Sequence, residues 1–358
     1  MGKRSKRKKV NKKLDKKASK WALKNKRLRT YKEVIDELTA KGIKPYDPST
    51  TFADFELWED SPLKKIFEEF FNYGQEYLDR KDLGFDIEPG RIYFSSNITL
   101  NALARKVGRY YLVEIYMGAI KWMYDFYMPK EDLFKDATLA PFIKITQIRK
   151  VTPAFFMLQL ASIYFLYHEV GHLIQRSGEA GDSLEFALHE CKGDKIKVSH
   201  MRELDADWHS AYCMAMAIKQ FAEVEIAGRM VVDRWLLSDI ASLGLAAIYM
   251  YFINRTDKRP ALYYEEKCHP HPTVRLSYMI IFIMENLQGN VGHELDQNTI
   301  LNNAILISEF LMKEKDKNIV EDYSKQLYEN SKSIEKYIHS IMDNTEKYPY
   351  LCKHLLKK

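Results

Sequence analysis

An apolar run that ends in three ionisable side chains constrains the fold more than any other feature of the sequence. Residues 155–167 (FFMLQLASIYFLY) carry no charge and few polar groups. A helix that is apolar on nearly every side must be buried, so we predict a buried helix over 153–176. His168, Glu169 and His172 follow directly in the same helix. Because such groups are costly to bury alone, we expect each to meet a partner.

The segment His168-Glu-Val-Gly-His172 has the HExxH spacing of zinc hydrolases. Two histidines at i and i+4 lie one turn apart on the same helix face, where both can bind one metal ion. Glu169 is then placed to take a proton from metal-bound water, whose pKa zinc lowers toward ~7. Gly171 lets another segment pack closely. The pattern also arises by chance, and its position on a buried helix is what favours Zn²⁺.

A catalytic zinc site needs a third protein ligand, and no third histidine follows at the expected spacing, where Gln175 and Gly178 stand. Glu203 and Asp207 share one face of the next predicted helix. We therefore expect Glu203 to bind the metal and Asp207 to accept the N–H of a ligand histidine. Ala206 is small enough for close helix packing. Other candidates for the third ligand are His189, Cys191, His200 and His209.

The segment Cys268-His269-Pro-His-Pro-Thr-Val-Arg275-Leu276 is a third candidate part of the site. His269 can donate a hydrogen bond to the oxyanion that forms at a peptide carbonyl, and Arg275 can support it. A His-Pro pair before a helix is also an ordinary helix boundary, so this segment alone indicates little.

Charge is divided unevenly along the chain. Residues 1–29 hold fifteen Lys or Arg and one acid, whereas the whole protein has a formal net charge of +6. The rest therefore carries a charge of about −8 on the same count. We expect any attraction to nucleic acid or to the ribosome to reside in this basic arm, with a solvated, disordered tail as the other interpretation.

The stretch 235–253 is almost long enough to cross a bilayer, but Ser238, Asp239 and Ser242 interrupt it. We favour a buried core helix, so contact with a membrane is not expected. The four cysteines lack CxxC spacing, and no signal peptide is evident. A reducing, cytoplasmic location is the simplest expectation.

The predicted fold class is α+β and predominantly helical, with strands at 91–96 and 110–116 and helices almost throughout the rest. The second strand alternates Tyr111, Val113 and Ile115 with their neighbours. Beyond residue 118 the expected helices cover 153–176, 199–222, 230–253 and 272–285, with two polar ones after 298.

Taken together, the three segments resemble the gluzincin peptidases, especially those with a Ste24/HtpX-like core. In these, HExxH is followed by ExxxD and then by His-Pro-x₄-Arg, which His168–His172, Glu203–Asp207 and His269–Arg275 match. Asn101–Ala104 and Tyr110–Gly118 also look like the phage-exclusion Lit-type peptidases. The resemblance covers about 90–285. One difference matters: Ste24/HtpX-like enzymes usually have clear membrane spans.

The resemblance implies a zincin-like domain with a small sheet beside the HExxH helix, with 110–116 as the edge strand that pairs with substrate. It implies a zinc endopeptidase with a protein substrate, a host translation factor among the candidates, and a role in phage defence. The residues alone leave open another zinc hydrolase, or a nucleic-acid- or ribosome-associated protein. The expected divisions are a basic disordered arm (1–30), an N-terminal helical segment (31–90), a zinc peptidase domain (91–290) and a C-terminal helical extension (291–358).

Overall fold

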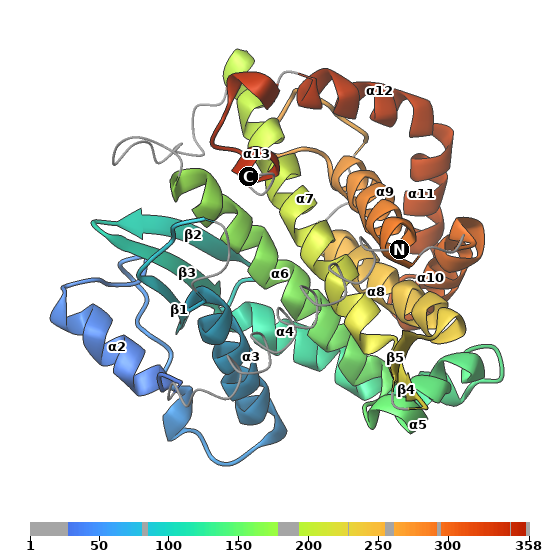
Figure 1. Ribbon diagram of the computed structural model, residues 1–358, viewed down its shortest axis with the longest axis horizontal. Helices are drawn as coiled ribbons and strands as arrows, with labels where there is room; N and C mark the ends of the chain where they lie inside the picture. The colour runs from blue at the N-terminus through green and yellow to red at the C-terminus, as the bar shows by residue number, and fades with distance from the viewer. Residues whose placement is uncertain are drawn as a thin grey trace, which may run out of the picture.

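The apolar run of the sequence forms α6 (Pro153–Ser177), which lies between a small sheet and the other long helices (Figure 1). This computed structural model describes residues 28–80, 85–177, 193–227, 229–254, 261–291, 295–343 and 345–355. Within them the protein is predominantly helical with a small mixed sheet, which confirms the predicted α+β class. The basic arm before residue 28 lies outside the described residues.

The other elements before and after α6 follow one another in short connections. Before α6 they are α2 (Tyr31–Ala40), η1 (Phe55–Leu57), α3 (Pro62–Leu78), β1 (Gly90–Ser95), β2 (Ala102–Val107), β3 (Tyr110–Tyr116), α4 (Met117–Tyr127), η2 (Met128–Lys135), η3 (Ala140–Ile143) and α5 (Lys144–Arg149). After it come α7 (Asp194–Phe221), β4 (Glu223–Ile226), β5 (Arg229–Val232), α8 (Arg234–Asn254), α9 (Pro272–Val291), α10 (Gln297–Met312), α11 (Lys317–Glu329), α12 (Ser331–Met342), η4 (Thr345–Lys347) and α13 (Cys352–Leu355).

The main sheet has the strand order β1-β3-β2, with β1 parallel and β2 antiparallel to β3. The strand at 110–116 is therefore central, and the prediction that it is an edge strand is wrong. Its alternating β-rich residues mark a strand but do not say which neighbours it has. Every residue of β3 is buried, as expected for a strand paired on both sides.

Helices α3 and α6 pack on the same face of the sheet. A Cβ placed on Gly74 of α3 would lie 2.8 Å from Ile92 of β1 and 3.5 Å from Leu166 of α6, so all three elements meet at this point. α2 is held beside β1 by Arg91, whose Nε and Nη2 donate to the two carboxylate oxygens of Glu37 at 2.9 and 3.0 Å. The sheet thus supports one side of α6.

On its other side α6 packs along α7, and α8 lies against both (Figure 1). α8 has the length and apolar composition of a membrane span, but 89% of its most apolar window is buried inside the molecule. It therefore serves as a core helix, as the interrupting polar residues suggested. A single hydrophobic core runs through the described residues from Tyr31 in α2 to Cys352 in α13.

Several elements differ from the expectations. β2 and the hairpin of β4 and β5 were not predicted, because their short strands carry charged residues and lack strict alternation. The hairpin occupies the start of the helix expected at 230–253, so α8 begins at Arg234. Three helices and the short α13 follow residue 296, where two were expected.

Gly171 marks the closest approach of α6 and α7. A Cβ on this residue would lie 2.8 Å from the Cα and 3.1 Å from the Cβ of Ala206. Both atoms belong to the core of α7 and cannot swing aside as a flexible side chain can. The pairing of a glycine with an alanine that the sequence suggested is therefore what lets the two backbones approach.

We expect Gly171→Ala to destabilise the fold by about 1–3 kcal/mol, because the added methyl group overpacks this contact. Urea unfolding measures the effect. Gly289→Ala in α9 is the matched control: a Cβ there meets nothing within 4 Å, so the change should stabilise the helix by about 0.5–1 kcal/mol. Equal effects at both positions would contradict the steric account.

Candidate metal centre

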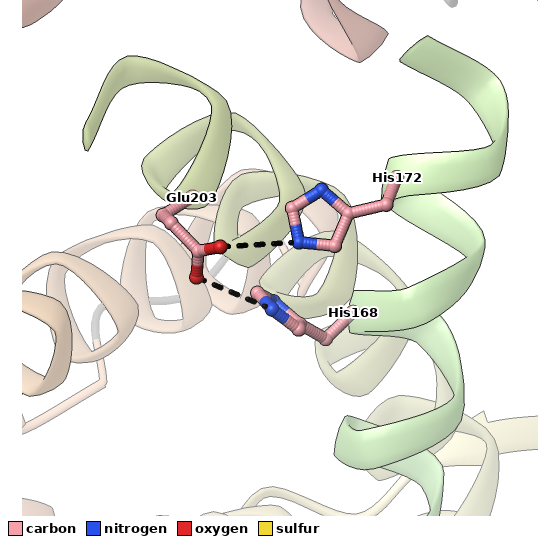
Figure 2. Close-up of side chains that lie close together, drawn as sticks. All are labelled: His168, His172 and Glu203. Atoms are coloured by element: carbon pink, nitrogen blue, oxygen red, sulfur yellow. Dashed lines mark ion pairs between the residues drawn. The ribbon is translucent and has the colours of Figure 1, made fainter. Parts of the chain in front are cut away.

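Three side chains from α6 and α7 point toward one another (Figure 2). Nε2 of His172 lies 3.4 Å from Oε1 of Glu203, and Nε2 of His168 lies 3.5 Å from Oε2 of the same carboxylate. Candidate ligand atoms of the three residues are all within 4.8 Å of one another. No other group of three or more such residues occurs within the described part of the chain.

These separations fit a single ion. Around a tetrahedral zinc with bonds of about 2.1 Å, neighbouring ligand atoms lie about 3.4 Å apart. The two measured nitrogen–oxygen distances, 3.4 and 3.5 Å, agree with this value and exceed those of good hydrogen bonds. Two imidazoles and one carboxylate are also a common donor set for catalytic zinc. His168, His172 and Glu203 can therefore hold a metal ion.

The second nitrogen of His168 faces a buried ion pair. Its Nδ1 lies 3.0 Å from Oδ1 of Asp207 and donates to it, which leaves Nε2 unprotonated toward Glu203. Asp207 also accepts from Nε and Nη2 of Arg275 at 2.7 Å each, and from the Tyr164 hydroxyl at 3.1 Å. Asp207 thus occupies the position expected for a carboxylate that orients a ligand histidine.

Charges in this cluster support one another. Burial disfavours an ionised Asp207, but the charge of Arg275 outweighs it and lowers the pKa of the carboxyl. Burial likewise opposes charge on Glu203, yet His269 and Arg275 hold its pKa well below the usual value. Burial lowers the pKa of His168, but Asp207 and Glu203 outweigh this and raise it to about 9. A bound cation must compete with that proton, so metal uptake releases protons.

The second nitrogen of His172 has a neutral partner. Its Nδ1 lies 3.2 Å from Oε1 of Gln175, one helical turn along α6. The sequence analysis noted Gln175 only as a position where a third ligand is missing. Its spacing of three residues from His172 was the signal that could have identified it. Tyr164 was missed in the same way, four residues before His168.

Glu169 lies between the metal helix and the sheet. It is 7% exposed, and within the described residues it has no hydrogen bond or ion pair. Its charge contributes to the raised pKa of Tyr116 at the end of β3, about 12, although burial of that hydroxyl and Glu114 contribute more. The carboxylate is thus close to the sheet and has oxygens available to accept a proton.

His269 lies at the open side of the site. Its Nδ1 is 3.3 Å from Oε1 of Glu203, and its side chain is 42% exposed. The loop that carries it is fixed to α7, because Ser199 donates to the Cys268 carbonyl and His200 Nε2 to the Lys267 carbonyl, both at 2.7 Å. His269 therefore borders the ligands without belonging to the group of three.

Arg275 lies on the opposite, buried side. Besides its two bonds to Asp207, its Nη1 is 3.2 Å from Oε2 of Glu203. The side chain is 3% exposed, and its guanidinium group packs on the Phe252 ring. The expected support of His269 by Arg275 is not seen among these contacts. Arg275 instead positions the carboxylates from behind.

The other candidate ligands have different partners. His200 holds the Lys267 carbonyl, as described above. His209 is buried with its ring edge-on to Tyr167 and Phe85, and its Nε2 lies 3.8 Å from the Cys213 thiol. His189 and Cys191 lie outside the described residues. Among the candidates that the structure describes, Glu203 alone joins the two histidines.

The chain was also compared with known proteins. No family model, no curated protein and no solved structure matches it. Interpretation of the site therefore depends on its own geometry.

His209 makes the stability of the fold depend on pH. Burial lowers the pKa of its imidazole to about 3, from 6.5 in an exposed chain. Between these values the unfolded state binds a proton that the folded state does not. Stability should therefore fall as pH falls, by about 1.4 kcal/mol per unit from this residue.

His209→Phe keeps the aromatic packing and removes the titration. Urea unfolding of chelator-treated protein at pH 4, 5 and 6 should show a slope shallower by about 1.4 kcal/mol per unit than wild type. The ligand residues titrate equally in both proteins, so the difference isolates His209. Parallel slopes would contradict the assignment.

Proposed function

We propose that the protein is a zinc-dependent endopeptidase that hydrolyses peptide bonds of an intracellular protein. The observation that carries the proposal is the zinc-like spacing of His168, His172 and Glu203 beside Glu169. Glu169 has no hydrogen bond or ion pair among the described residues. A buried site built only for structure has no use for a carboxylate of this kind.

The donor set favours zinc over the harder divalent cations. Magnesium and calcium prefer oxygen ligands, whereas two imidazoles suit zinc and neighbouring transition metals. Three protein ligands leave one tetrahedral position for water or substrate, which is the arrangement of catalytic rather than structural zinc. That position is expected on the side of His172 and His269, whose side chains are 20% and 42% exposed, against 8% for His168.

The residues of the chain have distinct parts in the proposed hydrolysis. When bound, zinc supplies a Lewis acid that makes water acidic enough to attack near neutral pH. Glu169 accepts the proton that this water loses and passes it to the leaving amine. His269 donates a hydrogen bond to the oxygen of the attacked carbonyl. Asp207 and Arg275 hold the ligands and do not touch the substrate.

An extended substrate needs a strand edge near α6. β3 is paired on both sides, but β2 (Ala102–Val107) pairs only with β3 within the described residues. β2 also packs against α6. We therefore assign the substrate-binding edge to β2, where main-chain groups can add a strand to the sheet.

The proposal extends to the protein class. A small sheet beside an HExxH helix, followed by a helix with Glu203 and Asp207, supports a zincin-like gluzincin of the Ste24/HtpX-like or Lit type. For such an enzyme, the burial of α8 supports action in the cytoplasm. A role in phage defence, with a host translation factor as substrate, belongs to the same proposal.

Two substitutions separate metal binding from chemistry. Glu203→Ala should abolish stoichiometric zinc, because it removes a ligand. Glu169→Gln should retain zinc and lose cleavage by about 10²–10⁴-fold, because an amide cannot accept the proton. Zinc is measured by elemental analysis of purified protein.

Cleavage is measured without knowing the substrate, by mass spectrometry of new protein N-termini in cells that express each protein. New termini that depend on Glu169 support peptide hydrolysis and identify the substrate. Stoichiometric zinc without any Glu169-dependent termini would reject the peptidase. A Glu169→Gln variant with full activity would reject the assigned base.

His269→Ala tests the oxyanion side. We expect a loss of about 10²–10³-fold in kcat on the identified substrate, with KM little changed, because the hydrogen bond forms mainly in the transition state. Zinc content should stay at the wild-type level. His339→Ala, an exposed histidine on α12, is the control. Loss of zinc in His269→Ala would show that this residue is a ligand instead.

A further inference from the structure

A chain of buried hydrogen bonds leads from one metal-ligand candidate to the C-terminal segment. Gln175 accepts from His172 Nδ1 at 3.2 Å, and its Nε2 donates to Oδ2 of Asp205 at 2.9 Å. The same Oδ2 accepts the backbone N–H of Cys352 at 2.7 Å, and Oδ1 accepts that of Lys353 at 3.2 Å. The chain thus links α6, α7 and α13 through side chains on the first two and backbone on the third.

The Gln175 amide can adopt only one orientation in this chain. Its second contact, at 2.9 Å, is with the backbone carbonyl of Arg202, which accepts and never donates. Asp205 also accepts. The amide nitrogen must therefore face these two groups, and Oε1 must face His172. Because Oε1 cannot donate, His172 carries its proton on Nδ1, and its Nε2 lone pair points toward Glu203.

Asp205 depends on the C-terminal segment for its own partners. It is fully buried, and two of its three described donors are the backbone N–H groups at the start of α13 (Cys352–Leu355). Cys352 also donates its thiol to the carbonyl of Gly171 at 3.3 Å, inside the HExxH segment. Figure 1 shows α13 beside α6 and α7. The segment 351–355 is thus anchored to both helices of the candidate metal centre.

We propose that the C-terminal segment 351–355 is a working part of the metal centre. It fixes Asp205, Asp205 fixes the Gln175 amide, and Gln175 holds His172 in the tautomer and orientation that bind the metal. Gln175 and Asp205 are positioning residues that touch neither metal nor substrate. The inference rests on the proposed zinc site, and it deepens that proposal by making the end of the chain a requirement for zinc affinity.

Breaking the chain has a defined consequence. Without the α13 N–H groups, the Asp205 carboxylate keeps one described donor, and such a buried group must reorient or find water. The Gln175 amide is then free to turn, and His172 loses the acceptor that selects its tautomer. Loss of such an outer contact typically weakens metal binding by about 10–100-fold. His168 is unaffected, because Asp207 and Arg275 hold it independently.

The decisive test uses paired substitutions in the full chain. Cys352→Pro removes the N–H that Asp205 accepts, at the first position of a helix, where proline is tolerated. Cys352→Ala keeps that N–H and removes only the thiol. Gln175→Leu breaks the chain at its centre. The matched control is Gln75→Leu: this glutamine is also buried and bonds to backbone at Gly90 and Ile92, remote from the site.

Zinc affinity is measured by competition with a chelating indicator dye, using Zn²⁺ alone as the probe. We expect binding weakened about 10–100-fold in Gln175→Leu and Cys352→Pro, and unchanged in Cys352→Ala and Gln75→Leu. The double variant Gln175→Leu/Cys352→Pro should be no weaker than Gln175→Leu, because both act through one chain. Additive losses would show general loosening and overturn the inference.

A second readout reports His172 directly. In ¹⁵N-labelled, zinc-loaded protein, the Nδ1–H of His172 should give a slowly exchanging imidazole signal in wild type and Gln75→Leu, and lose it in Gln175→Leu. Wild-type protein that binds no zinc would reject the proposed function itself. Stoichiometric zinc in wild type, with equal affinity and an unchanged His172 signal in every variant, would reject only the role of the C-terminal segment.

Discussion

The contact of Gly171 with Ala206 sets the distance on which the whole candidate site depends. The metal-binding side chains come from two helices, and His, Glu and Asp reach only a few ångströms from their backbones. With the helices this close, Glu203 spans both histidines at 3.4 and 3.5 Å, and Asp207 reaches the far side of His168 at 3.0 Å. A wider spacing would break all three contacts together, because one rigid helix carries both acids.

The close helix pair brings buried carboxylates together, and a third helix compensates for them. Ionised groups in an apolar interior need partners with good geometry, or they are neutralised by protonation. Arg275 on α9 provides this by binding Asp207 with two nitrogens and Glu203 with a third. The sequence reading placed this arginine at the oxyanion. Its burial shows instead that α9 stabilises the charges that the α6–α7 contact creates.

The parts of the site that follow helical periodicity could be predicted from the sequence, and the parts set by tertiary packing could not. His168 and His172, and Glu203 and Asp207, share a face by their spacing of four. The close approach at Gly171 follows from residue size. The position of β3 within the sheet does not follow, because alternation marks a strand without naming its neighbours. The Gln175 partners also escaped prediction, since they lie on α7.

The two histidines differ in their outer partners, and the charge of the site explains why. Glu169, Glu203 and Asp207 formally carry three negative charges and Arg275 one positive, so a divalent cation brings the group to neutrality. A carboxylate beside His172, like the one beside His168, would leave an uncompensated buried charge. The neutral Gln175 amide avoids this. It moves the charge of Asp205 one hydrogen bond further out, where the N–H groups of α13 can satisfy it.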